Sequence, residues 1–187
     1  MFLMNRLNLL IEYLHTFAEL KVPYRWWKIW MPFYQDDMFY TQDGKPPTAH
    51  ELIEQDKSIV CSGLINLARR FMNLPVPEID GIKGTTWTWF RYLDKKEPID
   101  TSKSYPVGTM LLRDYSDSQD QGHVAIIVTK GIHIHTQTII HAIPFHPIDS
   151  PLKNVGHVCL TQFVDSHYYP DGRTFYTHIC LPEYWLY

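Results

Sequence analysis

The chain contains three cysteines and ten histidines, and their positions indicate where thiol and imidazole chemistry could occur. Cys61 comes directly before an amphipathic run at 64–72, so we expect a helix that begins at or near this cysteine. The free amide hydrogens and the dipole of a helix N-terminus favour negative charge and can lower the pKa of a thiol there. Cys61 is therefore a candidate nucleophile, with a small buried core thiol as the alternative.

Two histidines could serve such a thiol. A nucleophilic thiolate usually works with an imidazole that accepts and returns a proton and with a third group that orients that imidazole. His123 follows Gly122 and opens the extended run 123–129, and His141 lies in the next run, 137–143. If the two runs pair as a hairpin, both histidines can lie on one face as base and orienting group. The alternative for each is a structural strand histidine.

The elements that would position these residues begin with helices. Apolar side chains recur every three or four residues in segment 1–20 and predict one amphipathic helix: Leu7, Leu10, Ile11, Leu14, Phe17 and Ala18. Polar residues interrupt this segment, so it fits neither a secretory signal nor a membrane span of ~18 apolar residues. Thr48 and Glu51 have capping-box spacing and predict a short helix that ends near Lys57.

Strands follow the helices along the chain. The aromatic-rich stretch 86–93 suits a short helix or a strand. From Tyr105 onward, β-branched and aromatic runs alternate with turn residues and predict strands at 109–113, 123–129, 137–143, 155–163 and 174–181. This segregation indicates an α+β fold, with N-terminal helices packed on a mostly antiparallel sheet. A length of 187 residues and no linker favour a single domain over 1–187.

Composition excludes several classes of partner. Seventeen Lys and Arg against twenty Asp and Glu give a net charge of -3, so nucleic acid and anionic membrane surfaces are not expected partners. A hydrophobic content of 45% excludes a disordered chain. Three cysteines without a CxxC pair form neither a disulfide framework nor a zinc ribbon. A reducing, cytoplasmic setting is the default, with delivery in a virion or release by lysis as alternatives.

Five short motifs follow one another between residues 22 and 143. In chain order they are Val22-Pro23-Tyr24-Arg25-Trp26, Cys61-Ser62-Gly63-Leu64, Tyr105-Pro106-Val107-Gly108-Thr109-Met110-Leu111, Gly122-His123-Val124-Ala125-Ile126 and Ile140-His141-Ala142. This series resembles the NlpC-type cell-wall peptidases, a branch of the papain-like cysteine peptidases. The circularly permuted relatives place histidine before cysteine, whereas Cys61 precedes His123 here. The resemblance is therefore to the unpermuted arrangement.

The resemblance implies a fold, a reaction and roles for four residues. The fold is papain-like, and the enzyme is a cysteine-dependent hydrolase, a thiol protease or amidase that needs no cofactor or metal. Cys61 attacks an amide carbonyl, His123 acts as base and then as acid, and His141 orients His123. The Cys61 backbone amide and the Tyr24 hydroxyl would stabilise the oxyanion. The substrate implied is a peptide amide, in particular a γ-D-glutamyl linkage to a diamino acid in peptidoglycan stem peptides.

The chain also departs from this family. Val60 stands where an Asp usually precedes the nucleophile, Thr109 stands where the family often has Asp, and Trp27-Lys28 replace a usual Gly-Gly. Segment 27–57 is a predicted insertion, rich in aromatic residues, that could cap the groove or bind a protein partner. The part from about 144 onward exceeds a minimal domain of this type.

Three other functions remain open. One is a non-catalytic domain of the same fold that binds a peptide or a protein partner. Another is an acyltransferase or thioesterase that uses the same thiol. The third is a metal site at His133 and His135, whose spacing puts both on one face of a strand, although no nearby carboxylate or cysteine completes a ligand set. Cys159 and Cys180 lie in apolar runs and are expected to be core thiols.

Overall fold

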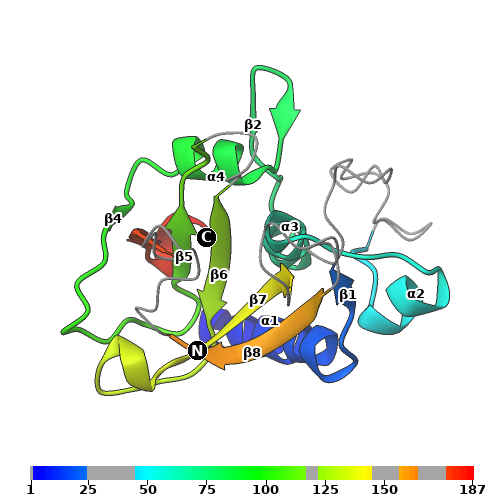
Figure 1. Cartoon of the computed structure of the whole chain (residues 1–187), viewed down its shortest axis with the longest axis horizontal. Coiled ribbons are helices and arrows are strands. Elements are labelled where there is room, and N and C mark those ends of the chain that lie inside the picture. The colour runs from blue at the N-terminus through cyan, green and yellow to red at the C-terminus, as the bar shows by residue number, and fades with distance from the viewer. Residues whose placement is uncertain (1, 25–44, 117–121, 145–155, 164–175) are drawn as a thin grey trace.

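In the computed structural model, the described residues are 2–24, 45–116, 122–144, 156–163 and 176–187 (Figure 1). The helices are α1 (Phe2–Glu19), α2 (Ala49–Glu54), α3 (Cys61–Phe71) and α4 (Thr86–Tyr92), with short 3-10 turns at η2 (Ile134–Thr136) and η3 (Pro182–Tyr184). The strands are β1 (Pro23–Tyr24), β2 (Glu78–Ile79), β3 (Ile82–Lys83), β4 (Glu97–Pro98), β5 (Met110–Arg113), β6 (His123–Ile127), β7 (Thr138–Pro144), β8 (Gly156–Gln162) and β9 (His178–Cys180).

Seven of the strands form one sheet in the order β1-β8-β7-β6-β5-β9-β4, and each neighbouring pair is antiparallel. The strands β2 and β3 form a separate hairpin beside α4, where the Thr88 hydroxyl donates to the Ile82 carbonyl at 3.0 Å. The predicted α+β class and antiparallel sheet are confirmed. The predicted hairpin of the two histidine strands is also present, because Ile126 of β6 lies opposite Ile140 of β7.

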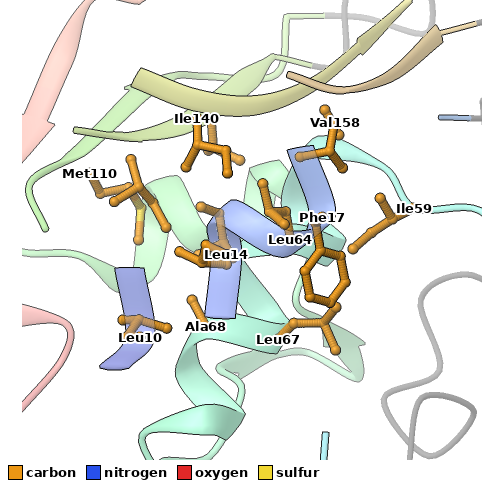
Figure 2. Close-up of a cluster of buried hydrophobic side chains, with 14 of the residues drawn as sticks. Leu10, Leu14, Phe17, Ile59, Leu64, Leu67, Ala68, Met110, Ile140 and Val158 are labelled. Carbon is orange, nitrogen blue, oxygen red and sulfur yellow. The ribbon is translucent and has the colours of Figure 1, made fainter. Parts of the chain in front are cut away.

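One face of the sheet packs against α1 and α3. Figure 2 shows Leu10, Leu14 and Phe17 of α1 beside Leu64 and Ala68 of α3, with strand residues above them. The strand residues that face these helices include Met110, Ile140 and Val158, all fully buried. Burial of this apolar surface, worth about 25 cal/mol per Å², holds α3 against the middle of the sheet.

The opposite face of the sheet carries a second apolar cluster. It contains Tyr105, Leu111, Ala125, Ile127, Ile134, Ile139, Phe163, Tyr176 and Ile179. Alternate residues of a strand point to opposite faces, so His123 belongs with Ala125, and His141 belongs with Ile139, on this second face. The start of α3 must therefore reach the start of β6, where His123 lies, for a thiol and an imidazole to meet.

Local elements mostly follow the sequence predictions. In the predicted capping box, the Glu51 amide donates to the Thr48 hydroxyl at 3.2 Å, and the Thr48 amide donates to Glu51 Oε2 at 2.6 Å. This helix ends at Glu54 rather than near Lys57, because Asp56 has a φ of 48° that α-helical backbone cannot adopt. The ambiguous stretch 86–93 is a helix, which Thr85 caps through the Thr88 amide.

The prediction that His133 and His135 alternate along a strand is wrong. They lie in and next to the 3-10 turn η2, where the Thr136 hydroxyl receives the Ile132 amide at 3.1 Å. Local side-chain bonds of this kind compete with strand pairing. The first part of the predicted insertion 27–57 lies outside the described residues, and 45–57 contains α2. Of the chain beyond 144, the described parts supply β8, β9 and η3. None of the helices in the described ranges is both long and apolar enough to span a bilayer.

Candidate active site

Cys61 is the first residue of α3, as the sequence predicts. The N-cap residue Val60 is extended, with φ -102° and ψ 169°, and its side chain makes no capping hydrogen bond. The first amides of a helix have no partner within the helix, so the absence of a side-chain cap leaves them to solvent, a thiolate or a ligand. The Val60 departure thus removes a competing acceptor from the helix start.

Contacts on both sides of His123 bring the start of β6 to Cys61. The backbone amide of Val124 donates to the Cys61 thiol, and the Thr86 Oγ1 lies 3.9 Å from Cys61 Sγ. On the other side of His123, a Cβ on Gly122 would meet the Thr86 methyl group at 2.8 Å. Because both chain neighbours of His123 lie against Cys61 or its partner Thr86, the candidate nucleophile and base share one location.

The pKa of the Cys61 thiol is raised above its ordinary value, because burial disfavours the charged thiolate. The Thr86 hydroxyl and the amides of Val124 and Ser62 lower it, since they donate hydrogen bonds to the sulfur. The Arg113 guanidinium lowers it through its positive charge. The net direction is opposite to the lowering that the helix start predicts, because desolvation outweighs the donors around the sulfur.

The two candidate histidines contact each other directly. Nε2 of His123 lies 3.2 Å from Nδ1 of His141. The same Nδ1 lies 2.8 Å from the Tyr176 hydroxyl oxygen, and Nε2 of His141 lies 3.2 Å from Thr161 Oγ1. A contact of this kind is how an orienting group fixes the ring of a base in a thiol–imidazole pair.

Burial keeps both rings neutral. His123 is 7% exposed and His141 is 3% exposed. Desolvation lowers the pKa of His123 well below its ordinary value, and the nearby His141 and Arg113 add to this effect. Burial alone lowers the pKa of His141 to about 3. At neutral pH, His123 is therefore a neutral imidazole that can accept a proton.

Several residues of this location were not predicted from the sequence. Arg113 of β5 lies opposite His123 in the ladder and is 6% exposed. Pairing of the predicted strands 109–113 and 123–129 is the signal that could have found it. Thr86, Thr161 and Tyr176 come from α4, β8 and the approach to β9 and carry no local motif.

Tyr24 lies in β1 and is buried. The Ile59 amide donates to the Pro23 carbonyl at 2.8 Å, and Tyr24 forms a parallel bridge with Ile59. This pairing holds β1 against the segment that leads into α3. Trp27 and Lys28, which depart from the family pattern, lie outside the described residues.

Of the other two cysteines, one lies in the core and one lies beside the histidine pair. Cys180 is buried in the core, and Cys159 is half-buried on β8 opposite His141. Burial raises the pKa of Cys159 to about 11 and that of Cys180 to about 12. In the described part of the chain, no group of three or more His, Cys, Asp or Glu side chains is placed to hold a metal ion.

Comparison with known proteins finds similarity among solved structures. The chain matches no family model and no curated protein. Among solved structures, it is similar to the crystal structure of a wild-type endolysin, LysIME-EF1, with a TM-score of 0.48 and 14% sequence identity. The match covers 94% of this chain and 64% of the endolysin chain. This chain therefore spans less than two thirds of that protein, and the chemistry of the site rests on its own geometry.

Proposed function

We propose that the protein is a cysteine-dependent amide hydrolase of the papain-like, NlpC type, with Cys61 as nucleophile, His123 as base and His141 as orienting group. The observation that carries the proposal is the 3.2 Å contact between His123 Nε2 and His141 Nδ1 at the strand end that meets the start of α3. This contact orients the His123 ring through Nε2, and we assign to its Nδ1 the role of accepting the thiol proton.

In the proposed reaction, the resting pair is neutral. As a substrate carbonyl carbon comes within reach, His123 Nδ1 takes the thiol proton, and the sulfur forms a bond to that carbon. The carbonyl electrons move to the oxygen, where the amides of the helix start are the available donors. When the C–N bond breaks, His123 returns the proton to the leaving amine. Water, deprotonated by His123, then releases the acyl group and restores the thiol.

Several groups around Cys61 stabilise the charged intermediate, although burial keeps the resting pair neutral. The Thr86 hydroxyl and the Val124 amide donate to the sulfur, and the Arg113 guanidinium contributes a nearby positive charge. Fixed donors in a site that excludes water need little reorganisation when charge develops. Burial raises the cost of the thiolate, and these groups offset part of that cost.

The substrate class follows from the five-motif resemblance, which indicates a peptide amide in peptidoglycan stem peptides. The assignment is tested with a panel of defined stem peptides, ordinary peptides and acyl thioesters. The panel is assayed with wild type, Cys61→Ala, His123→Ala and the matched control Cys159→Ala. We expect turnover of stem peptides, a loss of at least ~10³-fold in the first two variants, and activity near wild type in the control. Circular dichroism establishes that each variant is folded.

Other outcomes point to the alternatives. If folded Cys61→Ala still hydrolyses the substrate, Cys61 is not the nucleophile. If only Cys159→Ala loses hydrolysis, the nucleophile is Cys159 on β8. Binding of stem peptides without turnover supports the non-catalytic domain. Turnover of thioesters in preference to every amide supports the acyltransferase or thioesterase. An acyl-enzyme detected by intact mass in wild type and absent in Cys61→Ala separates covalent catalysis from hydrolysis by water alone.

A further inference from the structure

Nδ1 of His141 faces two polar neighbours but can form one strong in-plane hydrogen bond. His123 Nε2 lies 3.2 Å away, and the Tyr176 hydroxyl oxygen lies closer, at 2.8 Å. In a neutral imidazole, each nitrogen carries either a proton or a lone pair. The two neighbours therefore cannot both be satisfied by this atom in the same way, and the protonation of His141 determines that of His123.

The arrangement of the proton on His141 affects whether His123 can act as a base. If His141 Nδ1 carries the lone pair, His123 can donate from Nε2–H, which leaves His123 Nδ1 bare for the thiol proton. If His141 Nδ1 instead carries the proton, or if Tyr176 donates to its lone pair, His123 Nε2 has no acceptor there. The loss of this acceptor shifts the His123 proton towards Nδ1, and the ring with its proton on Nδ1 cannot accept from Cys61 there.

We propose that Tyr176 is a positioning residue that competes with His123 for Nδ1 of His141 and so limits the population of base-competent His123. This inference rests on the proposed function, because it assigns a role within the same thiol–imidazole pair. Removing the Tyr176 hydroxyl while keeping the ring removes one of the two groups that compete for His141 Nδ1 and leaves the other, His123. Thr161 Oγ1 then accepts from His141 Nε2–H, across a separation of 3.2 Å.

The surroundings make Tyr176→Phe a conservative change. Tyr176 is buried in the second apolar cluster, where its ring lies 5.5 Å from His123 and 6.3 Å from Phe163, measured between ring centres. The phenylalanine ring keeps these contacts. Among the described residues, Cys61, Cys159 and Arg113 act electrostatically on Tyr176, and Arg113 also acts on His123; this substitution leaves all three in place.

The test measures the rate at which iodoacetamide alkylates Cys61 across a range of pH, with Cys180 in the same samples as an internal reference. It compares wild type, Tyr176→Phe and the matched control Tyr105→Phe. Tyr105 belongs to the same apolar cluster, but its hydroxyl bonds to the backbone of Asp100 and not to a histidine. No substrate is needed, so this readout does not depend on the choice of peptide.

We expect Cys61 to be alkylated roughly two- to tenfold faster at neutral pH in Tyr176→Phe than in wild type, which is the effect of about one net hydrogen bond. In Tyr105→Phe, the rate should match that of wild type. In a His141→Ala background, Tyr176→Phe should no longer change the rate, because the Nδ1 atom for which Tyr176 and His123 compete is absent. Nitrogen-15 shifts of the imidazoles provide a second measurement in folded single variants. Tyr176→Phe should move the proton of His123 from Nδ1 towards Nε2.

A Tyr176→Phe rate equal to or below that of wild type, in a folded protein, overturns the inference, as does an equal gain in Tyr105→Phe. An unchanged His123 tautomer also overturns it. His123→Ala separates this failure from failure of the proposed function. If His123→Ala slows Cys61 alkylation while Tyr176→Phe has no effect, only the role of Tyr176 fails. If His123→Ala has no effect, the thiol–imidazole pair and the role of Tyr176 fail together.

Discussion

The hydroxyl oxygen of Thr86 lies 3.9 Å from Cys61 Sγ, and the methyl group of the same residue packs against the backbone of Gly122. One side chain from α4 thus contacts both the start of α3 and the residue before His123. The separation of nucleophile and base therefore depends on a third element. Four predictions follow from the contacts that hold these elements together.

Thr86→Val should slow alkylation of Cys61. The hydroxyl lowers the pKa of the thiol, so its removal raises that pKa and reduces the thiolate fraction at any pH below it. We expect a loss of roughly three- to tenfold in rate near neutral pH and a pH–rate curve displaced upward. Thr86→Ser keeps the hydroxyl and should resemble wild type. Equal pH–rate curves for Thr86→Val and wild type would show that the Thr86 hydroxyl does not affect the Cys61 thiol.

Gly122→Ala should cost stability and activity together. Gly122 has a φ of 73°, and an added Cβ would lie 2.4 Å from the Arg113 carbonyl oxygen. Gly81 is the matched control, since its φ is 77° but no atom lies within 4 Å of an added Cβ. Urea denaturation should give a loss of ~1–2 kcal/mol for Gly81→Ala from backbone strain, and a larger loss for Gly122→Ala. Equal losses would mean that the close approach is relieved at no cost.

His141→Gln should make the protein less sensitive to acid. Burial lowers the pKa of His141 to about 3, whereas the unfolded chain binds this proton near the ordinary value of ~6.5. Between these values the unfolded state binds more protons, so the free energy of unfolding falls as the pH falls through this window. At about pH 5, His141 accounts for a loss of about 2 kcal/mol in the free energy of unfolding. Urea denaturation near pH 7 and pH 5 should show a smaller loss in the variant, and equal losses would contradict the buried neutral ring.

Asn66→Ala should loosen α4 from α3. The Asn66 side chain accepts from Trp89 Nε1 at 2.8 Å and donates to the Gly84 carbonyl at 3.1 Å. Both partners are left unsatisfied in the variant, at a cost of ~1–3 kcal/mol each at most. Because α4 carries Thr86, Cys61 alkylation should also move towards the Thr86→Val profile. A folded variant with reduced stability and unchanged Cys61 reactivity would separate packing from the positioning of Thr86.

The sequence predicted the elements that carry the site better than the environment of the site. The position of Cys61 at a helix start and of His123 at a strand start depends on local pattern, and both are confirmed. The pKa of Cys61 depends also on burial by distant segments, which raises it, and a helix start seen in the sequence does not reveal that burial. Tyr176 reaches His141 across 35 residues of sequence, a distance that no periodicity can encode.

The strand at 133–135 was predicted wrongly for a related reason. Alternation of His and Ile fits a strand. The Thr136 hydroxyl instead accepts a hydrogen bond from the Ile132 amide, and the main chain forms the 3-10 turn η2. The domain organisation stays a prediction, with one unit over 1–187, an insertion at 27–57 and an extended part from about 144.

The two outermost strands of the seven-stranded sheet are each two residues long, and each contains a proline, Pro23 in β1 and Pro98 in β4. A proline offers no amide hydrogen to an incoming strand, and a two-residue strand offers too few bonds to template one. On the outer side of β1, the Pro23 carbonyl is already used by Ile59. The sheet therefore has little capacity to grow by edge-to-edge pairing of copies, which should protect concentrated samples from β-type aggregation.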